Sequence, residues 1–485
     1  MRFYRLLRAF SAIKGSVSDS GRFLPMVRSR NRIALCLSEA RSLAVMCAIS
    51  MLGALLAVPA TAASILGDEP IVIKATAREP ARIAVPTFDS GRSPVALKQN
   101  DFHTTIYNDL ELTGYFLRGR DQGFIEETHQ RDRKAREIDF AEWQRLDVLF
   151  LLAGDYEISR DRLEATCVLY YVPTGRRIFG KRFTNTVDQQ RVLAHRIADE
   201  VFRFVTAEEG IANTKVLFAS TTDPKRQKRE IWLMDADGAN PRQLTNDGSL
   251  VVTPCWGANA TEVYYTSYKD YNPDLCGVYL KGGAPWYISR FPGLNISPSW
   301  SQRRQRIVLT LGKDGNSEIY VTDRNGKNLK RLTYEREIDS SPQWSPDGND
   351  IVFTSNRRGS PQIYRMDAEG FNAQRISFVG SSYCDSASWS PKGDKIAFTA
   401  RRDGVFDIWV TELDGSNPQR LTQGQGNNED PCWSPNGLML AFTSDRTGST
   451  QIYIMNSDGS NQRRLTQRGY NTSPAWSPFL YGQSN

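Results

Sequence analysis

The most regular feature of the chain is a short pattern of apolar and polar positions that recurs six times in its second half. Five copies open with a tryptophan segment such as "PQWS", which a β-branched and aromatic run such as "DIVFTS" follows, and the sixth is split between the two ends of the array. A third run such as "QIYRMD" and a fourth such as "QRIS" complete the pattern. Runs of this kind between turn residues predict four antiparallel strands. One copy is too short to bury its own apolar side chains, so we expect the copies to pack on each other.

The spacing of the copies predicts the type of repeat. The tryptophans follow one another at intervals of 44, 44, 45, 44 and 43 residues, at Trp256, Trp300, Trp344, Trp389, Trp433 and Trp476. This is the period of four-stranded propeller blades. Paired-helix repeats have a similar period, but Asp-Gly or Asn-Gly pairs such as Asp237–Gly238 separate the third and fourth runs. Such pairs form tight turns between strands, which excludes the helical alternative.

The two ends of the repeat predict how the ring closes. The first strand, from Lys215, is of the second type, whereas the last, Pro474 to Leu480, is of the tryptophan type. Pairing them completes a sixth blade and removes an open sheet edge, which would otherwise invite aggregation. We therefore expect a six-bladed β-propeller over residues 213–485, closed by the C-terminal strand. The tryptophans are expected to pack between blades.

Residues 81–212 lack the repeat and predict a separate small domain. "ARIAVPTF" from Ala81 is typical of a buried strand, and Phe102, Ile106 and Leu110 have helical spacing. A strand from Asp147, a hairpin and an amphipathic helix from Gln189 follow. The fold class predicted for the whole chain is therefore α+β multidomain, with an α/β domain before the propeller. Residues 63–80 are expected to form a flexible arm.

The first 62 residues predict an export signal. They hold nine of the 61 basic residues but only two of the 54 acidic ones, so the remainder is balanced at 52 of each sign. An apolar run, Ser42 to Val58, leads to small residues at Ala60 and Ala62, as in a cleavable secretory signal. An uncleaved anchor is the alternative, and Met26 is a second plausible start. A neutral body argues against nucleic acid as a ligand.

Catalytic motifs are lacking in the sequence. The three histidines, His103, His129 and His195, all precede the propeller. The chain has neither a Gly-x-Ser-x-Gly pentapeptide nor a phosphate loop. Five cysteines follow the leader without a Cys-x-x-Cys pair, and their pairing stays open: Cys167, Cys255, Cys276, Cys384 and Cys432. Buried packing is the role we expect for most of them. The sequence predicts a protein that is not an enzyme.

Polar residues recur where the fourth strand of one blade leads to the tryptophan strand of the next. Repeat equivalence places these loops around one channel mouth, which would bind a protein ligand or a hard cation such as Ca²⁺. Asp339, Asp385 and Asp430 would be the carboxylates for Ca²⁺. The alternative is that these are ordinary loop residues. The candidates are Asn295, Ser297, Asp339, Ser340, Ser341, Asp385, Ser386, Glu429, Asp430, Thr472 and Ser473.

The six repeats, the terminal "SPAWSPFL", the domain opening "IVIKATAREPARIAVPTF" and the leader together resemble the TolB family, periplasmic propeller proteins of the Tol–Pal system. The resemblance implies a non-enzymatic adaptor that maintains outer-membrane integrity and supports cell division. It implies that the propeller mouth binds the lipoprotein Pal near Leu294 to Ser297 and Asp339 to Ser341, and that the N-terminal region binds TolA. Other outer-membrane or peptidoglycan-associated proteins are further candidate partners. The alternative is an exported hydrolase or carbohydrate-active enzyme that uses Asp or Glu.

Overall fold

The computed structural model describes residues 80–480, apart from 91–96, 98, 224 and 226. The predicted leader over 1–62, the second start at Met26 and all of the predicted arm over 63–80 except Pro80 lie outside the described residues. None of the described helices combines the length and the apolar character needed to span a membrane.

The N-terminal domain is built on a mixed five-stranded sheet. Its order is β2-β1-β3-β4-β5, in which β1 runs parallel to β2 and β3 while the other pairs are antiparallel. The long strands β3, β4 and β5 form two successive antiparallel hairpins. The strands are β1 (Ala81–Ala84), β2 (Phe116–Arg118), β3 (Phe150–Ser159), β4 (Arg162–Tyr171) and β5 (Arg176–Thr186).

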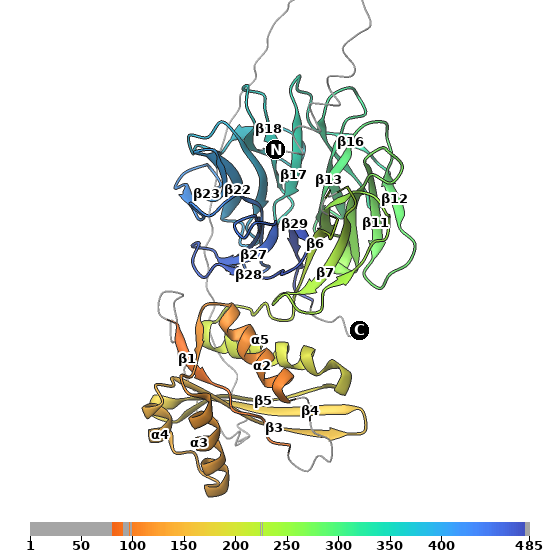
Figure 1. The fold of residues 1–485 in the computed structure, drawn as a ribbon. Helices are drawn as coiled ribbons and strands as arrows, with labels where there is room; N and C mark the ends of the chain where they lie inside the picture. The colour runs from red at the N-terminus through yellow and green to blue at the C-terminus, as the bar shows by residue number, and fades with distance from the viewer. Residues whose placement is uncertain (1–79, 91–96, 98, 224, 226, 481–485) are drawn as a thin grey trace, which may run out of the picture. The chain divides into compact units, whose positions relative to one another are not determined.

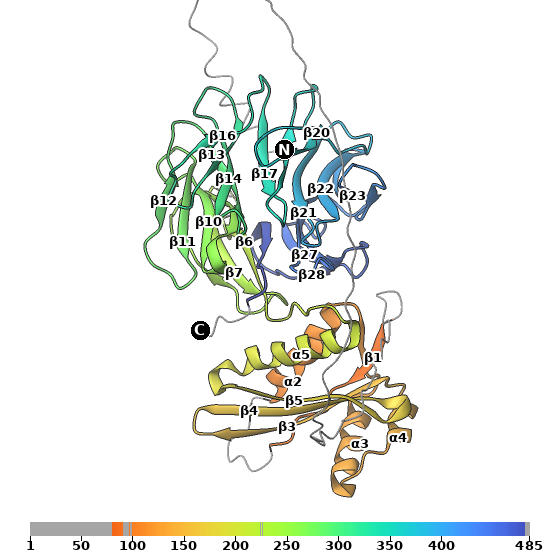
Figure 2. The ribbon, with the colours of Figure 1, turned by 180° about the vertical axis from the view of Figure 1, so that it is seen from behind.

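Helices cover both faces of this sheet. Helices α2 and α5 lie on one face, and α3 and α4 lie on the other (Figures 1 and 2). Ile106 of α2 and Ile197 of α5 are fully buried in the first layer, and Trp143 of α4 is fully buried in the second. The helices are α2 (Gln99–Leu112), α3 (Gln122–Ala135), α4 (Phe140–Arg145) and α5 (Gln190–Thr206), with 3₁₀ turns at Val172–Thr174, Val187–Gln189 and Ala258–Ala260.

The second domain is a ring of six four-stranded antiparallel sheets. The first blade is β29-β6-β7-β8, and the second to sixth blades follow in chain order from β9. The strands are β6 (Lys215–Thr221), β7 (Glu230–Asp235), β8 (Arg242–Gln243), β9 (Val251–Trp256), β10 (Glu262–Ser267), β11 (Asp274–Tyr279), β12 (Trp286–Ser289), β13 (Asn295–Ser301), β14 (Arg306–Leu311), β15 (Glu318–Thr322), β16 (Lys330–Arg331), β17 (Asp339–Trp344), β18 (Asp350–Ser355), β19 (Gln362–Asp367), β20 (Gln374–Arg375), β21 (Cys384–Trp389), β22 (Lys395–Arg402), β23 (Val405–Glu412), β24 (Gln419–Arg420), β25 (Asn428–Trp433), β26 (Met439–Ser444), β27 (Gln451–Asn456), β28 (Arg463–Arg464) and β29 (Tyr470–Trp476).

The C-terminal strand closes the ring as predicted. Strand β29 pairs antiparallel with β6, with Trp476 opposite Val216 and Asn471 opposite Ser220 (Figure 1). The first blade therefore combines one strand from the end of the chain with three from the start of the propeller. The prediction of a six-bladed propeller preceded by a small domain of helices and strands is confirmed.

In five blades, the hydroxyl of a Thr or Ser just after the fourth strand forms hydrogen bonds with the start of the third strand. In the third blade, Thr333 donates a hydrogen bond of 2.6 Å to the carboxylate of Glu318 and accepts one of 2.9 Å from the backbone of Ile319. Both Thr333 and Glu318 are buried. The repeated Thr or Ser at the end of the fourth strand is thus explained by hydrogen bonding, because a buried polar group needs a partner. The equivalent pairs are Thr245 with Glu230, Ser377 with Gln362, Thr422 with Asp407 and Thr466 with Gln451.

Candidate binding site at the propeller mouth

Each of the six innermost strands contains a β-bulge that faces the central channel. At each bulge the strand register shifts, and one non-glycine residue adopts a left-handed backbone with φ between 51° and 55°. A bulge of this kind redirects a side chain out of the regular alternation of a strand. All six residues line a channel cavity of about 470 Å³: Thr253, Ser297, Ser341, Ser386, Asp430 and Ser473.

Hydrogen bonds tie several bulges to the preceding blade. The backbone N–H of Ser341 donates to Thr310 Oγ1 at 3.2 Å, and that of Ser473 donates to Thr443 Oγ1 at 3.0 Å. Asp430 makes the same bond to Thr399 at 3.1 Å. The threonine near the end of the second strand, in the runs "LTL", "FTA" and "FTS", therefore holds the neighbouring bulge and fixes which side chain reaches the channel.

Acidic groups gather on one side of the channel. Asp430 accepts hydrogen bonds from the hydroxyls of Ser386 and Ser473, both at 3.2 Å, which come from the blades on either side. Burial, followed by the charge of Asp385, raises the pKa of Asp430. Burial and the charge of Asp430 likewise raise the pKa of Glu429. This part of the channel favours a ligand that brings a hydrogen-bond donor or a positive charge.

The structure brings five of the twelve predicted site residues together on the channel wall, namely Ser297, Ser341, Ser386, Asp430 and Ser473. Asp385 and Glu429 precede two of these bulges and are partly exposed, as is Thr472, whose hydroxyl accepts a 2.7 Å hydrogen bond from Arg229. Leu294 and Ser340 are buried. Asp385, Glu429, Thr472, Leu294 and Ser340 therefore do not line the channel cavity.

Asn295 and Asp339 also lie away from the channel. Both are fully buried at the start of an innermost strand. Asn295 donates to the backbone oxygens of Pro273, Phe291 and Gly293, and Asp339 accepts from Arg357 Nη2 at 3.0 Å. Their polarity serves to satisfy buried groups, because an unpaired polar group in the interior is costly. They hold the loops of the mouth and do not present a surface.

The three carboxylates expected for Ca²⁺ do not converge. Asp339 pairs with Arg357, whereas Asp385 accepts from Thr354 at 2.7 Å and Asp430 from its serine neighbours. Within the described part of the chain, no group of three or more His, Cys, Asp or Glu side chains could hold a metal ion.

The sequence analysis did not identify a group of exposed aromatic residues, here called the aromatic rim, at the same end of the ring as the predicted mouth. Tyr334 is 74% exposed and Phe378 is 56% exposed, and each has an arginine over its ring, Arg331 at 4.6 Å and Arg375 at 5.4 Å. Both lie in loops that enter an innermost strand, and the repeat-equivalent positions in the last two such loops are glutamines. This difference between aromatic residues and glutamines at equivalent positions is the feature of the sequence that could have identified the rim. The aromatic rim consists of Tyr271, Phe291, Tyr334 and Phe378.

The N-terminal domain contacts the opposite end of the ring. Lys392 and Asn436, in turns after innermost strands, bond Glu208 and the backbone oxygen of Glu209, both at 2.8 Å. Asn461, in a turn after a third strand, bonds the backbone oxygen of Leu112. Successive strands run between the two ends, so the mouth and the aromatic rim lie away from these contacts.

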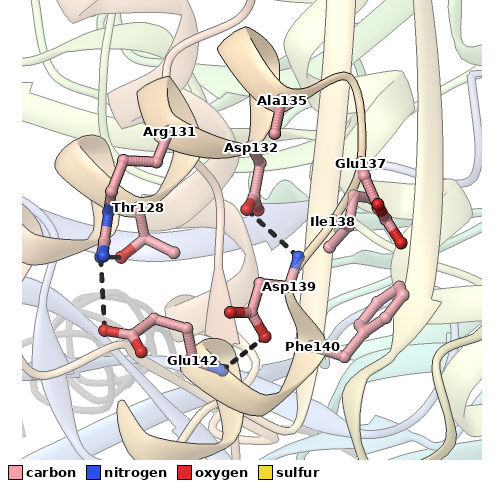
Figure 3. Close-up of a pocket in the computed structure, with 9 residues that line it drawn as sticks. All are labelled: Thr128, Arg131, Asp132, Ala135, Glu137, Ile138, Asp139, Phe140 and Glu142. Atoms are coloured by element: carbon pink, nitrogen blue, oxygen red, sulfur yellow. Dashed lines mark hydrogen bonds and ion pairs between the residues drawn. The ribbon is translucent and has the colours of Figure 1, made fainter.

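The N-terminal domain has a cavity of its own, of about 460 Å³, between α3 and α4 (Figure 3). Three of the acidic side chains that line it, Asp132, Asp139 and Glu142, already make hydrogen bonds or ion pairs within the domain. Asp132 accepts from the Trp143 indole at 2.7 Å and from the backbone of Asp139 at 3.1 Å, and Asp139 caps α4 by accepting from the backbone of Glu142. We assign these residues to holding α4 against α3.

The five described cysteines are free. Cys432 lines the channel, where its sulfur accepts a hydrogen bond of 3.1 Å from the backbone of Trp476 in the next blade. Ser299, at the equivalent position, accepts from the backbone of Trp344 at 3.2 Å. Burial raises the pKa of Cys432 to about 11, so it remains a thiol. Its role is to join blades, which is close to the packing role that we predicted.

Profiles of known protein families match both domains of the chain. The profile of the TolB amino-terminal domain matches residues 69–178, and that of the TolB beta propeller domain matches residues 202–388 and 382–480. The chain belongs to the TolB family. The resemblance stated from the repeats is thereby confirmed.

Individual TolB proteins show the same relationship. The chain is 33% identical to the Tol-Pal system protein TolB of Rickettsia africae over 230 residues, 47% of this chain and 51% of that one. It is also 33% identical to that of Ruegeria sp. over 212 residues, 43% of this chain and 47% of that one. It thus spans about half the length of the curated relatives it matches. The crystal structure of TolB from Acinetobacter baumannii shares the fold, with a TM-score of 0.74, 24% identity and coverage of 83% of this chain and 97% of that one.

Proposed function

We propose that this TolB-family protein is a periplasmic, non-enzymatic component of the Tol–Pal envelope system. Its propeller mouth would bind the lipoprotein Pal, and its N-terminal region would bind TolA. The names of the Rickettsia and Ruegeria relatives support membership of that system. An adaptor between an outer-membrane lipoprotein and an inner-membrane protein would support envelope integrity and cell division.

The aromatic rim carries the assignment of the binding surface. Exposed tyrosines paired with arginine are the side chains that most often dominate the energy of a protein interface. Tyr271 is 96% exposed and Tyr334 is 74% exposed on one end of the ring. The bulges beyond this rim offer hydroxyl groups and the Asp430 carboxylate, which suit a polar or basic side chain inserted by the partner, and the cavity that they line continues past Gln302 and Pro346 toward the opposite end of the ring.

The acidic channel residues also bear on the alternative of a hydrolase. A pair of carboxylates with raised pKa is a feature of some acid–base sites. Here, however, Asp430 is held by the hydroxyls of Ser386, Ser473 and Thr443. This arrangement favours binding over proton transfer to a substrate.

Calorimetric titration of the purified protein with the soluble domain of Pal from the same organism tests the proposal. We expect saturable one-to-one binding, weakened tenfold or more by Tyr334→Ala or Phe378→Ala, since hot-spot residues each contribute about 1–3 kcal/mol. Phe371→Ala is the matched control, because this phenylalanine is 69% exposed in a turn at the opposite end of the ring. Binding that is equally insensitive to all three changes would reject the mouth as the Pal surface. Absence of binding, with or without Ca²⁺, would reject Pal as the ligand.

A further inference from the structure

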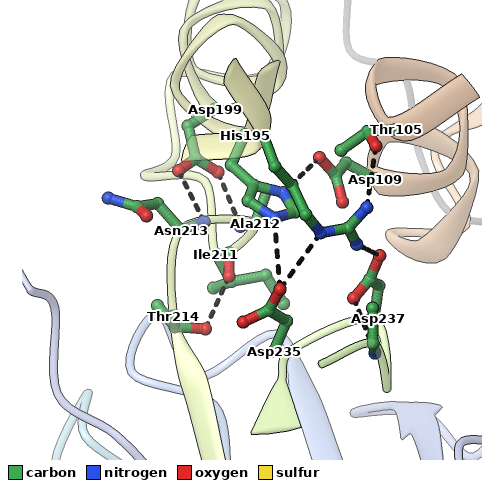
Figure 4. A network of polar contacts seen from close by, with 12 residues as sticks. Thr105, Asp109, His195, Asp199, Ile211, Ala212, Asn213, Thr214, Asp235 and Asp237 are labelled. Atoms are coloured by element: carbon green, nitrogen blue, oxygen red, sulfur yellow. Dashed lines mark hydrogen bonds and ion pairs between the residues drawn. The ribbon is translucent and has the colours of Figure 1, made fainter. Parts of the chain in front are cut away.

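A histidine lies between carboxylates of the two domains. His195 belongs to α5, and its Nδ1 is 2.7 Å from Asp109 Oδ2, on α2 of the same domain (Figure 4). Its Nε2 faces Asp235 Oδ2 at 3.8 Å, at the end of β7 in the first propeller blade. All three residues are at most 4% exposed. Only an imidazolium can direct an N–H toward each of the two carboxylates.

Two further cations surround the same carboxylates. Arg191, one helical turn before His195, donates from Nε to Asp235 at 3.1 Å and pairs through Nη2 with Asp237. Its third nitrogen donates to Thr105 Oγ1 at 2.8 Å. Lys215, at the start of β6, also pairs with Asp235. Three positive groups thus face Asp109, Asp235 and Asp237, so removal of one cation leaves a buried negative charge uncompensated.

The same helix also binds the linker between the domains, residues 207–214, which joins α5 to β6. Asp199, one turn after His195, accepts hydrogen bonds from the backbone N–H groups of Ala212 at 2.7 Å and Asn213 at 3.1 Å. A Cβ atom at Gly210 would lie 2.5 Å from the Cα of Asp199, so the linker must approach the helix closely here. Burial raises the pKa of Asp199 to about 7. Helix α5 is therefore hydrogen-bonded to the linker and ion-paired with the first blade.

We propose that the charged imidazole of His195 is a latch that holds the N-terminal domain on the first blade, and that its neutralisation releases α5 and the linker from the blade. Without the imidazolium, Asp109 and Asp235 face each other across a neutral ring, and the free energy of docking falls. The latch is a property of this fold and does not depend on which partner the mouth binds.

The charged groups around the ring set the pH at which the latch acts. They are Asp109 from α2, Asp235 and Asp237 from the first blade, Lys215 from β6, and Arg191 and Asp199 from α5. Burial opposes the charge on His195, but the carboxylates of Asp109 and Asp235 outweigh it and raise its pKa to about 9. The latch is therefore closed at neutral pH and opens as the pH rises through about 9.

Hydrogen–deuterium exchange of the purified protein provides a local test. The reporters are the backbone amides of Ala212 and Asn213 in the linker and those of β7, and the reference is β14 in the third blade. We expect His195→Gln to accelerate exchange at the reporters at least tenfold at pH 7 and to leave the reference unchanged. The matched control is His129→Gln, because His129 is also buried and faces a carboxylate, Asp89, at 3.8 Å, but within the N-terminal domain alone.

The wild-type protein gives a second, independent arm. After correction for intrinsic exchange, protection at the reporters should fall at least tenfold between pH 8 and pH 10, and His195→Gln should abolish this dependence. Protection that is equal in wild type and His195→Gln, or an equal loss in His129→Gln, would overturn the latch. Should His195→Gln fail to fold, wild-type protection that stays constant from pH 8 to pH 10 would overturn it by itself.

Discussion

The indole nitrogen of Trp476 donates a hydrogen bond of 2.8 Å to the hydroxyl of Thr214, across 262 positions of sequence. Both side chains are buried, and the hydroxyl donates in turn to the backbone oxygen of Ile211 in the linker. Thr214 immediately precedes β6, and Trp476 ends β29. Closure of the ring and attachment of the linker therefore meet at one pair of residues.

This bond predicts that the six tryptophans contribute unequally to stability. Trp476→Phe removes a buried hydrogen bond, which is worth about 1 kcal/mol. Trp344→Phe is the control. The Trp344 indole nitrogen is buried, and none of the described residues accepts a hydrogen bond from it. Denaturant unfolding should give a lower free energy of unfolding for Trp476→Phe than for Trp344→Phe, by roughly 1 kcal/mol. Equal losses would show that the seam bond contributes nothing.

The channel thiol supplies a second prediction. Cys432→Ser keeps an acceptor for the backbone N–H of Trp476, as Ser299 does for Trp344, and should change the free energy of unfolding by less than about 1 kcal/mol. Cys432→Val keeps the volume but leaves that N–H without a partner, at a cost of about 1–3 kcal/mol. The two variants can be compared in one urea titration series. Equal stability of the Ser and Val variants would contradict the hydrogen-bonding role.

The repeat made the propeller predictable from sequence, whereas the site was only partly so. The tryptophan period and the mismatched end strands at Lys215 and Trp476 encode blade number and closure, because each blade repeats the same local pattern. Loop polarity could not separate Ser341 from Asp339, because a β-bulge reverses which side chain reaches the channel and a bulge leaves no period in the sequence. The pairing of His195 with Asp235 depends on docking of the two domains, which no local sequence pattern records.

The burial of Asp339 changes what its substitution should do. The sequence placed it on the binding surface, where Asp339→Ala would weaken binding and leave stability intact. Because Asp339 is fully buried against Arg357 Nη2 at 3.0 Å, we now expect Asp339→Ala to lower the free energy of unfolding by roughly 3 kcal/mol. Glu335→Ala is the control, since Glu335 pairs with the same arginine at 3.3 Å but is 43% exposed, and should cost less than about 1 kcal/mol. A stable Asp339→Ala protein with impaired binding would restore the original interpretation.

The charge on His195 predicts how global stability depends on pH. Its pKa rises from 6.5 in the unfolded chain to about 9 in the folded protein, so the folded state binds the proton more tightly. The resulting stabilisation is complete below pH 6.5 and is lost as the pH rises through 9, and it amounts at most to about 3 kcal/mol. Urea unfolding at pH 6 to 10 should therefore show a decline in wild type that is absent in His195→Gln, so that the two stability curves converge at high pH. Curves that stay parallel over this range would show that His195 carries no extra proton in the folded state.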